Sequence, residues 1–157
     1  LLFQLISRER PNAVFHLYGP DNGNLAELKK LRKSLGLEKK VTFFSERTRE
    51  ELDLLARDYS FFLQTSPSEG FSISIAESMQ LGLIPVTTNV GEIQYYCKHM
   101  INSVIINGFN DTVKDLMYLS KNPKLLSQIR MNSINTWTGS VLYRDDILLK
   151  CNDLLNS

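Results

Sequence analysis

The sequence predicts an α/β fold built on a doubly wound, Rossmann-like parallel sheet. Short apolar runs alternate with segments of helical periodicity along most of the chain. These runs are continuously apolar, which is typical of parallel strands that helices cover on both faces. The 157 residues, 43% hydrophobic and 22% charged, match the size and composition of one globular domain. In such a fold, ligands bind at the carboxyl ends of the strands.

Five strands are expected from the apolar runs, and each is followed by a turn or a helical segment. The first run ends in a glycine turn at Gly19, and the fourth is rich in β-branched residues. The predicted strands lie at residues 13–19, 41–44, 60–64, 83–88 and 103–106.

Helices are expected between and after the strands, from apolar residues spaced three or four apart. Pro11 ends the first helix, and Gly36 suits the residue just after the second. Thr48 with Glu51 three residues later predicts a capping box at the start of the third. Ser72 is the expected N-cap of the fourth. The predicted helices lie at residues 1–10, 24–35, from 48, 72–81, 91–97, 111–120, 123–135 and from 141 onward.

Charge and cysteine content exclude several classes of protein. A net charge of +1 argues against nucleic-acid binding, and no apolar run approaches the roughly 20 residues of a membrane span. Cys97 and Cys151 lie far apart without a metal-binding spacing, which fits a reducing cytosol. Eight Lys and Arg gather within residues 29–49. They form either a solvated helix face or a basic patch for anionic lipid or a phosphorylated partner.

The two ends of the chain are both expected to be helical. Residues 1–11 read as the interior of an amphipathic helix without Met or N-cap, so we expect the chain to be part of a longer protein. The helical C-terminal tail begins near residue 141.

The most informative segment for function runs from Tyr59 to Cys97. It holds no Lys or Arg, and two of its three acids, Glu69 and Glu77, flank the start of the helix at 72–81. A helix N-terminus offers free N–H groups and partial positive charge to a phosphate. Two nearby carboxylates could accept bonds from sugar hydroxyls, so a nucleotide or nucleotide sugar fits. Alternatively, Glu69 is a loop acid that favours the helix dipole and Glu77 a solvated helix position.

The string SPSEGFSISIAESMQLGLIPVTTNVGEI at residues 66–93 resembles the donor-binding signature of family 4 of the retaining GT-B glycosyltransferases. HLYGP at 16–20 and LGLEKKVTFFS at 35–45 are similar to two further segments of that family. The resemblance implies that residues 1–157 form one nucleotide-sugar-binding domain, the C-terminal half of a GT-B fold. The first strand of this half and the N-terminal acceptor domain would then precede Leu1.

The resemblance also implies a role for each matching residue. Glu69 would be the catalytic residue, binding hydroxyls of the donor sugar and supporting charge in the transferring ring. Glu77 would accept bonds from the ribose. The sugar and diphosphate would meet backbone N–H groups of Gly70, Phe71, Ser72 and Ile73, and the base and ribose would be bordered by Gly19, Pro20 and Ser45. No metal or cofactor is expected beyond a UDP- or GDP-type sugar donor.

Departures from the family pattern keep other functions open. Ser72 and Ser45 stand where the family usually has Gly, and the diphosphate-binding Arg and Lys would precede Leu1. The chain alone is therefore expected to be inactive. The alternatives are a degenerate, non-catalytic nucleotide- or protein-binding module and a nucleotide-sugar epimerase of the same fold.

The resemblance further implies a setting in polysaccharide biosynthesis. The acceptor would be a glycan or lipid-linked sugar, bound through the N-terminal domain. The full-length protein would be cytoplasmic, with peripheral association at the inner membrane face allowed. No nucleic-acid partner is expected.

Overall fold

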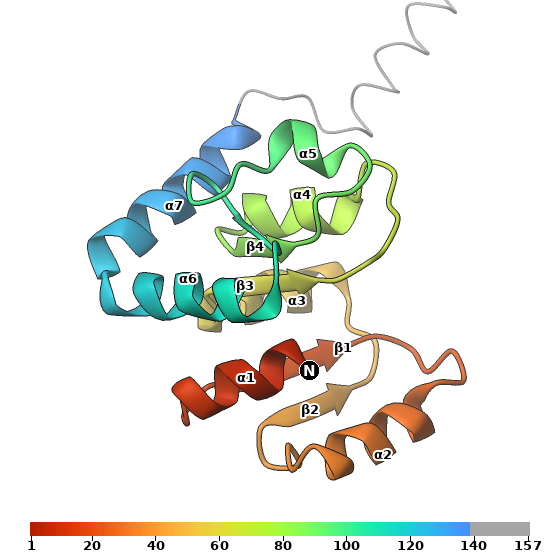
Figure 1. Ribbon diagram of the computed structural model, residues 1–157. Coiled ribbons are helices and arrows are strands. Elements are labelled where there is room, and N and C mark those ends of the chain that lie inside the picture. Colours follow the sequence, from red (N-terminus) through yellow and green to blue (C-terminus); the bar gives the residue numbers. More distant parts are fainter. Residues whose placement is uncertain (139–157) are drawn as a thin grey trace, which may run out of the picture.

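The alternation of helices and strands is confirmed in the computed structural model, which describes residues 1–138 (Figure 1). The strands are β1 (Phe15–Tyr18), β2 (Val41–Phe44), β3 (Phe61–Gln64), β4 (Ile84–Thr87) and β5 (Val104–Ile105). The helices are α1 (Leu2–Glu9), α2 (Leu25–Ser34), α3 (Arg49–Leu55), the 3₁₀ turn η1 (Ala56–Asp58), α4 (Ile73–Gln80), α5 (Ile93–Tyr96), α6 (Phe109–Lys121) and α7 (Pro123–Thr136). The predicted helix from residue 141 lies outside the described residues.

The start of α3 follows the predicted capping box. The backbone N–H of Glu51 donates to the Thr48 hydroxyl at 3.3 Å, and the N–H of Thr48 donates to Oε2 of Glu51 at 2.8 Å. Two N–H groups that the helix itself leaves unpaired are thereby satisfied. The first residue of α3, Arg49, consequently has a fixed backbone position.

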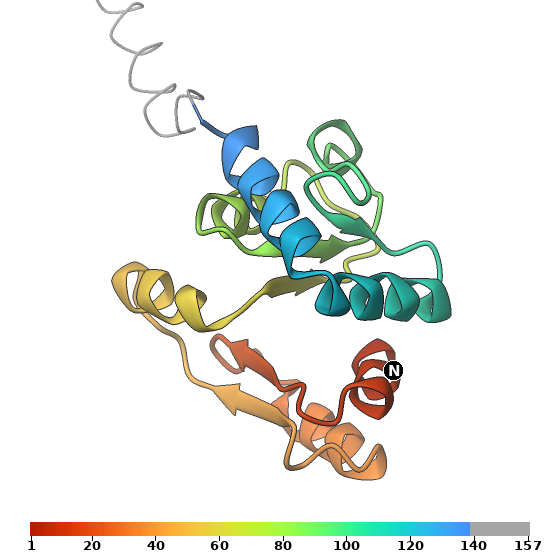
Figure 2. The same cartoon turned by 90° about the vertical axis from the view of Figure 1, so that its left-hand side faces the viewer.

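The pairing of the strands confirms the predicted parallel type of sheet. All ladders are parallel, but they form two sheets, β1–β2 and β3–β4–β5 (Figure 2). In both views α1, β1, β2 and α2 lie together below the larger group of β3–β5 with α4–α7. The alternation of elements predicts the type of sheet, but pairing depends on which distant strands come to lie side by side.

Helices cover both faces of the larger sheet, as expected for buried parallel strands. On one face Ile84, Val86 and Val104 pack with Leu116, Leu119 and Ile129 from α6 and α7. On the other face Ile75 and Met79 of α4 pack with Ile93, Cys97 and Ile105. All four residues of β4 are buried, whereas those of β1 and β3 are only half-buried. The carboxyl ends of β3 and β4 thus rest on a rigid, two-sided core.

The basic segment at residues 29–49 covers α2 and the loops that follow it. No residue of α2 is buried, which fits a solvated helix face. Arg32 is partly structural, because its guanidinium lies 5.5 Å from the centre of the Phe43 ring and donates to the carbonyl of Val41 at 3.0 Å. No helix within residues 1–138 combines the length and the apolar character needed to cross a membrane.

Candidate functional site

The loop between β3 and α4 carries Glu69 and is organised around Gln64, the last residue of β3. The Gln64 amide nitrogen donates to Oε1 of Glu69 at 2.5 Å. Its carbonyl oxygen accepts the hydroxyls of Ser72 at 3.0 Å and Ser74 at 3.1 Å. One side chain therefore connects the predicted catalytic carboxylate to the start of α4. Gln64 is not among the site residues predicted from the sequence, although a polar residue that ends an apolar strand is a usable signal.

Ser72 occupies the N-cap position of α4 but does not act as the predicted cap. Its backbone is left-handed, with φ 56° and ψ 78°, and its side chain makes no capping bond. The hydroxyl instead turns inward to Gln64, and the residue is only 9% exposed. A left-handed backbone is costly for a residue with a Cβ, which explains why glycine suits this position. Without a side-chain cap, the first N–H groups of α4 remain available to an anion.

The same loop is supported from the turn after β4. Gly91 has φ +56°, and a Cβ added there would lie 1.8 Å from the carbonyl oxygen of Glu69. The N–H of Glu92 donates to the carbonyl of Gly70 at 3.2 Å, and the Thr88 hydroxyl donates to the Ser66 carbonyl at 2.6 Å. Only glycine allows this approach of the two loops, so Gly91 fixes the backbone that carries Glu69.

An aromatic cluster closes one side of this region. Phe71, Tyr96 and Trp137 pack with ring centres 5.3–5.5 Å apart, and the Tyr96 hydroxyl donates to the Phe71 carbonyl. Burial is the main reason why the pKa of the Tyr96 phenol lies above its usual value, with nearby negative charges adding to the shift. Tyr96 therefore stays a neutral donor that orients the backbone before α4.

Glu77 lies in the second turn of α4 and is bound by Arg49 at the start of α3. Nη1 of Arg49 donates to Oε1 of Glu77, and Nε donates to Asp53 at 2.9 Å. Burial by itself would lower the pKa of Arg49, but the attraction of Glu77 and the hydrogen bonds to both carboxylates raise it above its usual value. The segment from Tyr59 to Cys97, which holds no Lys or Arg of its own, is thus contacted by a cation from another part of the chain. The sequence placed Arg49 in the basic stretch, but it could not show which acid it faces.

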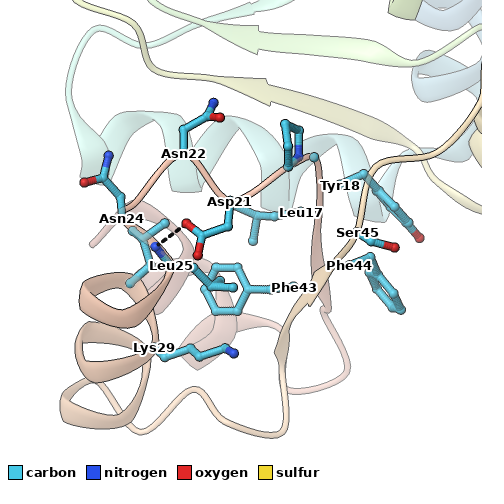
Figure 3. Close-up of a pocket in the computed structure, with 13 residues that line it drawn as sticks. Leu17, Tyr18, Asp21, Asn22, Asn24, Leu25, Lys29, Phe43, Phe44 and Ser45 are labelled. Atoms are coloured by element: carbon cyan, nitrogen blue, oxygen red, sulfur yellow. Dashed lines mark hydrogen bonds between the residues drawn. The ribbon is translucent and has the colours of Figure 1, made fainter.

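The predicted base-bordering residues Gly19, Pro20 and Ser45 line one cavity of about 510 Å³ at the carboxyl ends of β1 and β2 (Figure 3). Leu17, Leu25 and Phe43 form apolar walls, while Asp21, Asn22, Asn24 and Lys29 supply polar groups. The Asp21 carboxylate accepts the N–H groups of Gly23 at 2.8 Å and Leu25 at 3.2 Å, which fixes the loop before α2. Glu69 and Glu77 do not line this cavity. The predicted site residues therefore form two groups. Ser45 lines the cavity, and Arg49, shortly after it in the sequence, contacts Glu77 of the other group, so one short segment connects the two.

His16 has a packing role rather than a ligand role. It lies half-buried on β1, bonded through Nδ1 to the Tyr59 hydroxyl and packed edge-on against Phe44. Tyr59 also shares a hydrogen bond of 2.9 Å with Tyr18. Burial is the main reason why the pKa of Tyr59 is raised, and the bond to Tyr18 adds to the shift. Among residues 1–138, no three His, Cys, Asp or Glu side chains gather in an arrangement that could hold a metal ion.

Comparison with known proteins gives a consistent family. The family model for glycosyl transferases group 1 matches residues 1–136. A GDP-mannose:cellobiosyl-diphosphopolyprenol alpha-mannosyltransferase from Xanthomonas oryzae pv. oryzae (strain PXO99A) is 31% identical over 84 residues, which cover 54% of this chain and 22% of that protein. This chain thus matches less than a quarter of the length of that relative.

Solved structures show the same fold. The C-terminal domain of a glycosyl transferase group 1 family protein (LpcC) from Francisella tularensis has a TM-score of 0.73 at 19% identity, over 88% of this chain and 77% of that one. A TarM mutant from S. aureus, in complex with Fondaparinux, alpha-GlcNAc-glycerol and UDP, has a TM-score of 0.83 at 20% identity, over 99% of this chain and 31% of that one. The fold is shared with the C-terminal domain of a glycosyl transferase group 1 family protein, and the family model matches most of the chain. The chain belongs to the glycosyl transferases group 1 family.

Proposed function

We propose that this chain is the donor-binding half of a retaining glycosyltransferase that uses a nucleotide-diphosphate sugar. The observation that carries the proposal is the placement of Glu69 and Glu77 on either side of the uncapped start of α4. Carboxylates bind hydroxyls and a helix start binds phosphate, so this segment matches the polar parts of a sugar nucleotide. Membership of the family and the UDP held by the TarM mutant support it.

The chemistry of transfer divides among the two groups of site residues. The leaving diphosphate needs compensation of negative charge, which the N–H groups of Gly70–Ile73 and the dipole of α4 can supply. Glu69 would hold sugar hydroxyls and support positive charge on the ring, since Gln64 keeps its carboxylate in place. Glu77 would hold the ribose, and the cavity beside Gly19, Pro20 and Ser45 would receive the base. The proposal includes no metal and no further cofactor.

The activity of the whole protein requires more than residues 1–157. We propose that an acceptor domain completes the whole protein, since the matched segment covers only 22% of the Xanthomonas relative. A further strand between β1 and β3, which share no ladder, would join the two parallel sheets. The acceptor would be a glycan or a lipid-linked sugar, in line with the diphosphopolyprenol named for the Xanthomonas relative. A cytoplasmic protein working at the inner membrane face fits such an acceptor.

Titration of the chain with UDP, GDP and ADP, followed by amide NMR shifts, tests the proposal. We expect saturable shifts at Gly70–Ile73 with UDP or GDP at millimolar concentration, since the diphosphate-binding cations are expected outside the chain. Glu77→Gln should weaken binding about tenfold or more by removing charge-assisted bonds to the ribose. Glu38→Gln, an exposed acid in the loop before β2, is the matched control. Equal binding by Glu77→Gln and the parent chain would contradict the ribose contact.

The degenerate, non-catalytic module remains the second candidate, favoured by the left-handed Ser72 where the family usually has Gly. It predicts nucleotide binding without sugar transfer by the full-length protein. A transfer assay with the full-length protein and the nucleotide sugar of the base that binds separates the two.

A further inference from the structure

The ion pair between Arg49 and Glu77 joins two segments that are 28 residues apart in sequence. Its side chains keep 44% and 43% of their surface exposed. Ion pairs this exposed contribute little to folding stability, because water screens them and two long side chains must be ordered. The stability of the fold therefore does not account for this contact.

Two contacts besides the one to Glu77 restrict the position of Arg49. Its backbone is fixed at the first turn of α3 by the capping box of Thr48 and Glu51. Its Nε donates to Asp53 one helical turn later at 2.9 Å, which directs the guanidinium plane toward α4. The backbone of Arg49 and its guanidinium group therefore each have a contact that does not involve Glu77.

The contact takes only part of the hydrogen-bonding capacity of Glu77. Nη1 of Arg49 binds Oε1, and no donor within residues 1–138 binds Oε2. An ionised carboxylate has about four acceptor positions, so hydroxyl groups of a ligand can still bind. A free glutamate would lose side-chain entropy on binding, whereas one already held by Arg49 has lost part of it beforehand.

We propose that Arg49 is a positioning residue for nucleotide binding, which orients the Glu77 carboxylate toward the ribose and receives its own orientation from Asp53. This inference rests on the proposed function, since it requires Glu77 to bind the ribose. Arg49 itself acts through Glu77 and does not touch the ligand.

A double-mutant cycle on the chain tests this role, with UDP and GDP as probes and the dissociation constant from NMR titration as the readout. Arg49→Met should weaken binding about three- to tenfold, and the same substitution in a Glu77→Gln background should change it less than about twofold. Arg49→Lys should restore binding only in part, because lysine lacks the planar fork that binds Asp53 and Glu77 together. Arg57→Met on η1, an exposed arginine without an ion pair among the described residues, should leave binding unchanged.

A second readout uses 2′-deoxy-UDP and 2′-deoxy-GDP. If Arg49 acts through the ribose contact, the penalty of Arg49→Met shrinks with these probes. An equal penalty in the parent and Glu77→Gln backgrounds would overturn the inference, because Arg49 would then act on the phosphates or on the fold. Tighter binding by Arg49→Met would overturn it too, since the arginine would then compete with the ribose.

Failure of the inference can be told apart from failure of the proposed function. If Glu77→Gln weakens binding and Arg49→Met does not, the ribose contact stands and only the role of Arg49 is wrong. If Glu77→Gln has no effect, the ribose contact and the role of Arg49 are both wrong.

Discussion

The left-handed backbone of Ser72 predicts an unusual order of stability among substitutions at this position. Forcing a residue with a Cβ into this conformation costs about 1–2 kcal/mol. Glycine removes that cost but adds about 0.5–1 kcal/mol of backbone entropy loss on folding. Ser72→Gly should therefore be more stable than Ser72→Ala by roughly 0.5–1 kcal/mol, since both variants lose the same hydroxyl.

The loss of the Ser72 hydroxyl determines how the free energies of unfolding of both variants compare with that of the parent chain. Its bond to Gln64 at 3.0 Å contributes about 0.5–1.5 kcal/mol. Ser72→Ala loses this bond and keeps the backbone cost, so it should be destabilised by about 1 kcal/mol. In Ser72→Gly the gain and the two losses nearly cancel, and its free energy of unfolding should lie within about 1 kcal/mol of the parent.

Ser74 supplies a matched control, because its hydroxyl also donates to Gln64, at 3.1 Å, but its backbone is helical. At that position the order should reverse, with alanine more stable than glycine by about 1 kcal/mol. Urea denaturation of the four variants measures these differences. If Ser72→Ala is as stable as Ser72→Gly while the control behaves as expected, the reasoning about the backbone of Ser72 is refuted.

Three further predictions concern the support of the loop that carries Glu69 and the burial of Cys97. Gly91→Ala should lower the free energy of unfolding, measured by urea denaturation, by more than about 2 kcal/mol, because its Cβ would lie 1.8 Å from the Glu69 carbonyl oxygen. Gly70→Ala is the control and should lower it much less, because the space around Gly70 is open. Gln64→Leu should release the Glu69 side chain and weaken binding of the nucleotide sugar more than binding of the free nucleoside diphosphate, which paired titrations would show. Burial raises the pKa of the Cys97 thiol to about 11 from its usual value of 9.0, so the thiolate fraction at pH 8 falls about a hundredfold. Alkylation of Cys97, followed by mass spectrometry, should be correspondingly slow until urea unfolds the chain. The stability that this neutral thiol contributes is complete below about pH 9 and is lost as the pH rises toward 11.

Much of the local structure could be predicted because it depends on neighbours in sequence. The capping box of Thr48 and Glu51 needs only a spacing of three residues, and the structure has both of its bonds. The strand runs needed only continuous apolar character, and the five observed strands lie within the predicted ranges. Ser72 shows the limit of such reasoning, because its residue type predicts a cap, whereas the inward bond to Gln64 turns the side chain away.

The α/β alternation, the family resemblance and the two carboxylates beside the start of α4 can all be recognised from the order of the residues. Periodicity, spacing and residue type along one segment suffice for these. Three further features became visible only in the folded chain: the strands form two sheets, Gly91 supports the backbone of Glu69, and Arg49 contacts Glu77. These contacts join segments roughly 20 to 30 residues apart, and their partners are set by how helices and strands pack. Charge and spacing within either segment alone carry no information about that packing.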